Sequence, residues 1–154
     1  MDDLPGMLDF LENHEATKYL AFTDSQKSPD GARDMLEMII ASYETDEPIF
    51  SLAVTEIEGG RFIGFCGFGP CENGGEMEVF YNIIPEKQKQ GFASEALKAL
   101  VSHASCRFRP HRLVAVVISS NLASVKVAEK AGFKYSGPAI RLGRAGMRYV
   151  LELS

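Results

Sequence analysis

The apolar pattern of this chain changes at residue 49 from helical spacing to runs of β-branched and aromatic residues, and these runs predict a β-sheet. Three such runs are separated by short turns that contain glycine, and they cover residues 49–56, 61–68 and 76–84. Turns of this kind connect neighbouring antiparallel strands. A predicted helix over residues 91–105 and a predicted buried strand over residues 111–118 follow. The order of strands and helices predicts an α/β or α+β fold with a mixed sheet.

Two helices are predicted before the first strand. Asp3 can cap a helix over residues 4–13, and Ser28 can cap a second helix that ends near Tyr43. The spacing of apolar residues in the second helix predicts a buried face made of Leu36, Ile39, Ile40 and Tyr43.

The C-terminal third is predicted to complete the sheet. A short helix over residues 122–130 ends at Gly132, and strands are predicted over residues 133–136 and 147–153. No repeat or linker interrupts the sequence, and 154 residues with 45% hydrophobic composition suit one domain over residues 1–154.

Charge and cysteine content narrow the classes of function. The net charge of −5 and the pI of about 5.2 argue against a nucleic-acid-binding surface and favour cationic partners. Three cysteines cannot all pair within one chain and lack zinc-ligand spacing, so we expect reduced thiols and no metal site. The acidic start and the absence of a long apolar run predict a cytoplasmic protein without membrane contact.

A short loop between a predicted strand and the start of a predicted helix has the composition of a phosphate site. Gly91 and Ala93 lack bulk, so successive backbone N–H groups can point outward where the helix N-terminus adds positive partial charge. Lys87 and Lys89 are expected to add mobile positive charge beside the loop. The Walker loop is excluded because GxxxxGK[ST] is absent. A glycine at a helix start is also compatible with plain capping, so the loop alone leaves both interpretations open.

Two polar residues, Asn121 and Ser124, lie three positions apart on the predicted buried face of the helix over residues 122–130. Buried polar groups need hydrogen-bond partners. These residues can be a helix cap and a back-bonded hydroxyl, or they can bind the amides and thioester of a ligand.

Taken together, the segment Gln88-x-x-Gly91-x-Ala93, the pair Asn121-x-x-Ser124 and the run Glu129-Lys130-x-Gly132-Phe133 resemble the GCN5-related N-acetyltransferase (GNAT) family. The second and third motifs, with Asp3-Leu4-Pro5 near the start, are similar to its ribosomal-protein alanine N-acetyltransferase branch. The resemblance covers essentially the whole chain. It implies a central mixed, mostly antiparallel twisted sheet flanked by helices, and acetyl-CoA as cofactor.

The sequence departs from the family pattern in two places. The first family strand is expected to be missing or to lie outside this chain, because the sequence starts at the Asp-Leu-Pro helix. Many members also carry a tyrosine seven residues after the asparagine, and here that position is Ala128. The proton donor for the leaving thiolate must therefore lie elsewhere.

Catalytic candidates follow from the resemblance and from strand alternation, which predicts one face of the third strand with Glu76, Glu78, Phe80 and Asn82 and an opposite face with Met77, Val79, Tyr81 and Ile83. Glu78 is the predicted base, because the resemblance places a strand glutamate there, beside an apolar acyl pocket. A solvent-facing glutamate is an equal alternative, and Glu76 is the second candidate for the base. Ser124 or Tyr81 is the predicted acid, although a core role for Tyr81 is favoured. Direct attack is expected, because no histidine lies close in sequence to a cysteine nucleophile.

The resemblance also implies a set of cofactor-binding residues around the loop, the preceding strand end and the following helix. Backbone N–H groups of Ile83 or Ile84 are predicted to polarise the thioester carbonyl. The full set is Ile83, Ile84, Gln88, Lys89, Gln90, Gly91, Phe92, Ala93, Ser94, Asn121 and Ser124.

The predicted function is an acetyl-CoA-dependent transfer to a primary amine, either a protein N-terminus or a small molecule, by a monomer or homodimer. The alternative is a non-catalytic CoA-binding or partner-binding module on the same fold. Residues 20–30 and 137–146 are predicted loops that shape the acceptor pocket, and they carry no signature of the acceptor.

Overall fold

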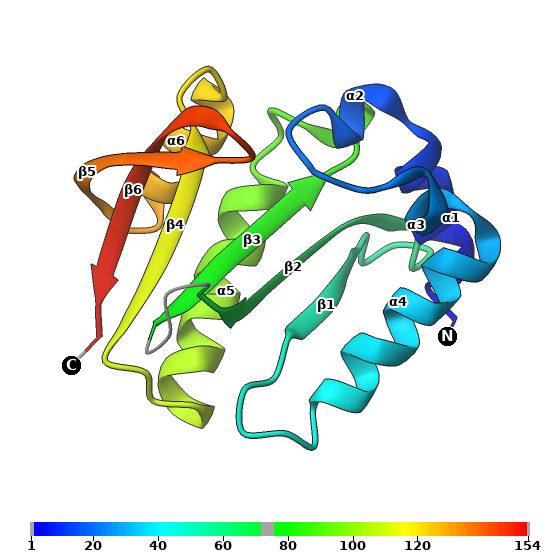
Figure 1. Cartoon of the computed structure of the whole chain (residues 1–154), viewed down its shortest axis with the longest axis horizontal. Helices are drawn as coiled ribbons and strands as arrows, with labels where there is room; N and C mark the ends of the chain where they lie inside the picture. The colour runs from blue at the N-terminus through cyan, green and yellow to red at the C-terminus, as the bar shows by residue number, and fades with distance from the viewer. Residues whose placement is uncertain (1, 72–75, 154) are drawn as a thin grey trace.

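The strands form one mixed sheet in the order β1-β2-β3-β4-β6-β5 (Figure 1). The computed structural model describes residues 2–71 and 76–153, so the predicted turn at residues 73–75 lies outside the described residues. The strands are β1 Phe50–Thr55, β2 Phe62–Pro70, β3 Met77–Ile83, β4 Arg112–Ile118, β5 Lys134–Arg141 and β6 Arg144–Glu152. Every neighbouring pair is antiparallel except β3 and β4, which are parallel. The prediction of a mixed, mostly antiparallel sheet is confirmed.

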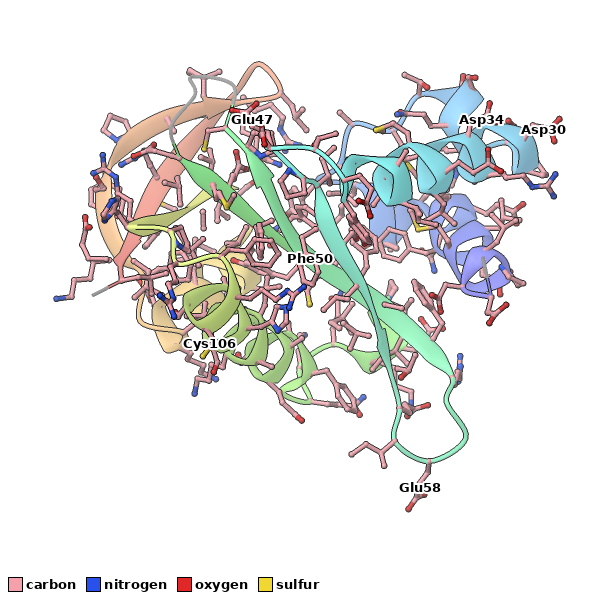
Figure 2. The ribbon with its side chains drawn as sticks, turned by 90° about the horizontal axis from the view of Figure 1, so that it is seen from below. Asp30, Asp34, Glu47, Phe50, Glu58 and Cys106 are labelled. Carbon is pink, nitrogen blue, oxygen red and sulfur yellow. The ribbon has the colours of Figure 1, made fainter. Side chains whose placement is uncertain are left out.

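Helices cover both faces of the sheet (Figure 2). The helices are α1 Leu4–Glu12, α2 His14–Thr17, α3 Asp24–Lys27, α4 Pro29–Ser42, α5 Phe92–Arg107 and α6 Leu122–Lys130, with a 3₁₀ turn at Pro85–Lys87. On one face α1 packs on β2 and α4 on β1, whereas α5 packs on β2 and β3 and α6 on β4. Figure 2 also places Glu58 at the tip of the β1–β2 hairpin.

Each face has its own apolar core. Phe68, Leu97 and Leu113 are fully buried between the sheet and α5. Phe10, Leu11 and Ile63 are buried under α1 and α4. Burial of each such side chain stabilises the fold by roughly 1.5–3 kcal/mol. The core under α5 includes Val79 of β3, and the other core includes Ile84, directly after β3, so the end of this strand is fixed between them.

The buried face of α4 differs from the prediction. Ala32 and Met35 are buried, whereas Ile40 is 48% exposed and Tyr43 is 40% exposed. A Cβ atom at Gly31 would lie 1.9 Å from the carbonyl oxygen of Ser25, so α4 meets α3 at this glycine. The buried face of α4 therefore includes Ala32 and Met35, next to this contact, while Ile40 and Tyr43 lie toward solvent.

The chain between residues 137 and 146 is a β-hairpin and not the predicted loop. Strands β5 and β6 extend to a two-residue turn at Leu142 and Gly143, with φ of 54° and 68°. Positive φ at both positions matches the twist of paired strands. Pro138 is tolerated because β5 is an edge strand, where the missing N–H need not serve a neighbour.

Helix caps agree in part with the sequence. The Ser28 hydroxyl accepts a hydrogen bond from the Gly31 amide at 3.1 Å, as predicted. Asp3 occupies the N-cap position of α1, but its side chain makes no capping hydrogen bond to the described residues. The short helices α2 and α3 were not predicted; Asn13 caps α2, and Thr23 forms a capping box with Gln26 at α3. Within the described parts of the chain, no helix combines the length and apolar character needed to cross a membrane.

Candidate active site

The parallel strands β3 and β4 are in register only at their N-terminal ends. Met77 pairs with Leu113 and Glu78 with Val114, and beyond these residues the strands spread apart (Figure 1). A narrow cavity of about 60 Å³ lies in the spread and is lined by both strands, by Tyr19 and by Arg141. The spread therefore opens a passage between two central strands of the sheet.

Backbone amides of β3 point into this spread. The Ile84 amide donates to the carbonyl oxygen of Ile63 at 2.9 Å, which places alternate amides of β3 toward β2. The amides of Tyr81 and Ile83 then point to the side of β4, where the described register gives them no strand partner. The predicted role of the Ile84 amide is wrong because that amide is bonded to β2. The role of Ile83 stays a prediction.

The predicted phosphate loop forms an unusual backbone turn before α5. Lys89 and Gly91 both have positive φ, of 60° and 91°, and Gly91 is the N-cap of α5. Within the described residues no side chain caps this helix, so the first N–H groups of α5 remain available. The Gln88 side-chain amide donates to the carbonyl oxygen of Ile83 at 2.9 Å and ties the loop to the end of β3. The helix N-terminus is therefore arranged as an anion site.

A second, larger cavity of about 690 Å³ begins at this loop and adjoins the narrow one. Gly91, Ala93 and Ser94 line it, and so do most of the other loop residues. The two cavities share the lining residues Tyr19, Tyr81, Asn82, Asn121 and Ser124. A continuous path therefore leads from the N-terminus of α5 into the spread between β3 and β4.

Asn121 and Ser124 lie where this path narrows, and both side chains are hydrogen-bonded to other groups of the chain. The Asn121 side-chain oxygen accepts from the Ser124 amide at 3.2 Å and caps α6. The Ser124 hydroxyl donates to the Tyr81 hydroxyl at 3.0 Å instead of bonding back within its helix. The capping interpretation thus holds for Asn121, while both side chains also line the two cavities.

Tyr81 spans the spread from β3 to the first turn of α6. Its hydroxyl donates to the carbonyl oxygen of Ser124 at 2.9 Å, and its ring packs against the core under α5. Burial raises the pKa of Tyr81 to about 12, so the phenol is protonated at neutral pH. Ala128, at the position of the family tyrosine, is fully buried in the core. Tyr81 therefore lines both cavities with a protonated hydroxyl, whereas the side chain of Ala128 carries no proton donor.

The two glutamates of the third predicted strand are both ion-paired to arginines. Glu78 forms an ion pair with Arg141. Glu76 accepts hydrogen bonds from Arg148 at 2.7 and 2.8 Å, and these bonds lower the pKa of Glu76 below its ordinary value. Glu76, the second candidate for the base, is thereby made a weaker proton acceptor. The predicted alternation itself is confirmed, since Val79 and Tyr81 pack on the α5 side while Phe80 contacts Phe65 on the other face.

The lysines predicted beside the loop have different surroundings. Lys87 forms an ion pair with Glu56 at 2.5 Å and is partly buried, so the expectation that it adds mobile charge is wrong. The large cavity is lined by the five lysines Lys18, Lys87, Lys89, Lys126 and Lys130, and by one acidic residue, Glu15. In the described residues Lys89, Lys126 and Lys130 have no ion-pair partner, which leaves a local excess of positive charge in an acidic chain.

The comparisons with known proteins agree with this geometry. Residues 1–134 match the family model described as acetyltransferase (GNAT) domain. The chain belongs to the GNAT acetyltransferase family. It is 30% identical over 142 residues to the uncharacterized N-acetyltransferase p20 of Bacillus licheniformis, covering 89% of this chain and 76% of that protein.

Solved structures share the fold of this acetyltransferase. The ribosomal-protein-S5-alanine acetyltransferase from Vibrio fischeri has a TM-score of 0.84 at 16% identity, covering 98% of this chain and 88% of that one. The protein yncA from Salmonella typhimurium, solved with its cofactor acetyl-CoA, has a TM-score of 0.76 at 21% identity, covering 99% of this chain and 90% of that one.

Two residues that line the site of this acetyltransferase are not indicated by any sequence motif. Tyr19 follows α2 and lines both cavities, where its hydroxyl is 3.5 Å from the carbonyl oxygen of Ser120. Arg141, at the end of β5, reaches Glu78 on β3. Neither carries a local signal, because both arrive at the site from distant segments of the chain.

The histidines and cysteines lie outside the cavities. His103 stacks on Phe50 with ring centroids 5.2 Å apart, which confirms a packing role. Cys66 is buried, and burial raises the pKa of its thiol to about 11. A protonated, buried thiol is a poor nucleophile, so Cys66 is unsuited to nucleophilic catalysis.

Proposed function

We propose that the protein transfers an acetyl group from acetyl-CoA to a primary amine, by direct attack while both substrates are bound. The observation that carries this proposal is the continuous path from the uncapped N-terminus of α5 into the spread between β3 and β4. Family membership supports the class of reaction.

The residues along the path fit the parts of acetyl-CoA. The N–H groups of the first turn of α5 suit a pyrophosphate, and Lys89, Lys126 and Lys130 suit the remaining anionic charge. The amides of Tyr81 and Ile83 suit an extended arm, because they offer hydrogen bonds that β4 does not take. Acetyl-CoA has an anionic head followed by a polar, extended arm. This order matches the cationic end of the path at α5 and the open amides of β3 further along it.

When bound, acetyl-CoA supplies a thioester carbonyl. In the transfer, the carbonyl carbon gains a bond to the amine nitrogen and loses its bond to sulfur. The nitrogen loses one proton and the sulfur gains one. The protein must therefore accept a proton on one side of the spread and stabilise sulfur on the other.

Glu78 is proposed to accept the proton of the amine, through a water molecule. It lies at the closed end of the spread, on the face of the sheet opposite α5, where it forms an ion pair with Arg141. Glu78 is not among the described residues that line the two cavities, whereas Arg141 lines the narrow one, so a water molecule is needed to connect Glu78 with the amine.

Tyr81 and Ser124 are proposed to stabilise the leaving sulfur by hydrogen bonding. A phenol with a pKa of about 12 is a much weaker acid than a thiol, whose ordinary pKa is about 8.5. Complete proton transfer from Tyr81 to the sulfur would be unfavourable, whereas a hydrogen bond to the developing charge costs no such transfer. To act as donors, the Ser124 and Tyr81 hydroxyls turn their protons toward the sulfur and away from their present acceptors, the Tyr81 hydroxyl and the Ser124 carbonyl oxygen. Solvent supplies the final proton.

Calorimetry with acetyl-CoA and an assay of free CoA in the presence of amines test the proposal. We expect acetyl-CoA to bind and CoA to appear only when an amine is added. Binding of acetyl-CoA without CoA release from any amine, including peptides with free N-termini, would favour the alternative of a CoA-binding module.

A further inference from the structure

Arg141 is the one charged side chain among the described residues that line the narrow cavity. The rest of the lining is apolar or carries amide and hydroxyl groups. The end of the path at Arg141 is remote from the lysine-lined end at the loop, since Arg141 lines only the narrow cavity. A guanidinium in such surroundings favours an anionic partner.

The described contacts of Arg141 use only part of its hydrogen-bonding capacity. Nη1 bonds to Oε1 of Glu78, and a guanidinium carries five N–H donors in a planar fork. The arginine side chain is 32% exposed and lines the narrow cavity, so a ligand there can reach it. A guanidinium has the geometry that binds a carboxylate through two parallel hydrogen bonds.

The pair of Glu78 and Arg141 presents a negative and a positive group side by side. An α-amino acid carries the complementary arrangement, an ammonium group next to a carboxylate. We propose that the amine acceptor carries a carboxylate beside its amino group, with Arg141 binding the carboxylate and Glu78 reaching the amino group through a water molecule. This inference rests on the proposed acetyl transfer and names its substrate class.

The same contacts disfavour other amines. A peptide N-terminus offers a neutral carbonyl where Arg141 needs an anion, and a polyamine places a second cation near the guanidinium. The net charge of −5 attracts cations at long range, but at a contact distance the nearest charges decide.

Matched acceptors test this proposal. CoA release is measured with L-alanine, L-serine and L-leucine, each compared with its carboxamide and its decarboxylated amine, and with a peptide that begins with alanine. We expect kcat/KM for the best amino acid to exceed that for its carboxamide by about tenfold or more, the usual effect of losing a charge-assisted hydrogen bond.

Variants separate recognition from structure. Arg141→Gln should reduce the ratio of acid to carboxamide to about one, and Arg141→Lys should retain part of it, while acetyl-CoA affinity measured by calorimetry stays unchanged in both. Arg148→Gln is the matched control, because Arg148 also pairs a glutamate of the same segment but does not line the cavity. It should keep the ratio.

Two outcomes overturn the proposal. In the first, the wild type uses the carboxamides, amines or peptide as well as the amino acids; the proposed acetyl transfer then stands and the substrate class falls. In the second, the ratio survives Arg141→Gln in a variant whose thermal unfolding shows that it is folded. If acetyl-CoA binds but no compound of the panel releases CoA, both the acetyl transfer and the substrate class are rejected.

Discussion

Glu78 and Asn121 illustrate how single side chains at this site serve structure and proposed chemistry together. Glu78 is held by Arg141 at the closed end of the spread, and Asn121 caps α6 where the path narrows. Removing either side chain therefore removes a structural contact as well as a group of the site. Each prediction for them therefore uses a control variant at another residue that makes the same kind of structural contact.

Replacing Glu78 by glutamine should lower kcat/KM by about a hundredfold or more, because the amide keeps the shape but cannot accept a proton. Acetyl-CoA affinity should not change. The rate should also lose its fall toward acidic pH, which steady-state kinetics over a pH series would detect. Glu76→Gln is the control, since its carboxylate is held by Arg148 and Arg112. Full activity of Glu78→Gln across pH would exclude Glu78 as the base.

Replacing Asn121 by alanine should have two separable effects. Loss of the cap should destabilise the fold by about 0.5–2 kcal/mol. Loss of the amide group beside the arm of acetyl-CoA should weaken binding by about 1–3 kcal/mol. Asn13→Ala is the matched control, because Asn13 caps α2 with the same spacing but does not line either cavity. If Asn121→Ala and Asn13→Ala lose equal stability in denaturant and both keep the acetyl-CoA affinity of the wild type, Asn121 has a capping role alone.

At the scale of elements, the turn before α5 combines backbone conformation with the position of a cavity. Positive φ at Lys89 and Gly91 turns the chain so that α5 begins with open amides at the wall of the large cavity. A side chain at Gly91 would meet no neighbouring atom within 4 Å, so space does not require this glycine. Its φ of 91° does, since residues with a Cβ rarely adopt it.

Gly91→Ala should therefore weaken acetyl-CoA binding by about tenfold, because relief of a strain of about 1–2 kcal/mol would move the amides that hold the anion. Calorimetry measures the affinity and thermal unfolding measures the stability. Gly60→Ala introduces similar strain, at a φ of 64°, in the β1–β2 turn away from the cavities. It should lose stability and keep affinity. Equal acetyl-CoA affinity in both variants would contradict an anion site at this turn.

At the scale of the whole molecule, Glu76 joins three strands at the closed end of the spread. It precedes β3 and bonds to Arg112 of β4 at 2.8 Å and to Arg148 of β6. These bonds oppose separation of the two halves of the sheet, while the other end of β3 and β4 stays apart. The spread is thus fixed at one end by charge pairing and open at the other.

This arrangement predicts a loss of stability in acid. The pKa of Glu76 is lowered in the folded state from its ordinary 4.5, chiefly by the Arg148 hydrogen bonds. The unfolded chain then binds its proton at a higher pH than the folded chain does, so the stabilisation is present above that value and is lost as the pH falls through the folded pKa. Thermal unfolding over a pH series should show Tm of the wild type falling in acid.

Glu76→Gln should have a lower Tm than the wild type at neutral pH and a smaller fall in acid. Glu58→Gln, at the exposed tip of the β1–β2 hairpin, should follow the wild type (Figure 2). An acid profile of Glu76→Gln that is identical to that of the wild type would exclude Glu76 as a source of this pH dependence.

The sequence by itself determined most of the strands and the longer helices of this protein, but not α2, α3 or the β5–β6 hairpin. Alternation along residues 76–84 correctly placed Val79 and Tyr81 on one face and Phe80 on the other, because the side-chain period of a strand is local. Gly91 at a strand-to-helix junction likewise indicated an anion site, because positive φ and open amides depend on a few neighbouring residues.

Only the tertiary structure decided which groups meet. The Ile84 amide is used by β2, Lys87 is paired with Glu56, and Arg141 crosses from β5 to Glu78. Each of these contacts joins segments far apart in the chain. They depend on the register of β2 with β3, on the spread of β3 from β4 and on the reach of the β5–β6 hairpin, and local residue patterns do not encode the relative positions of such elements.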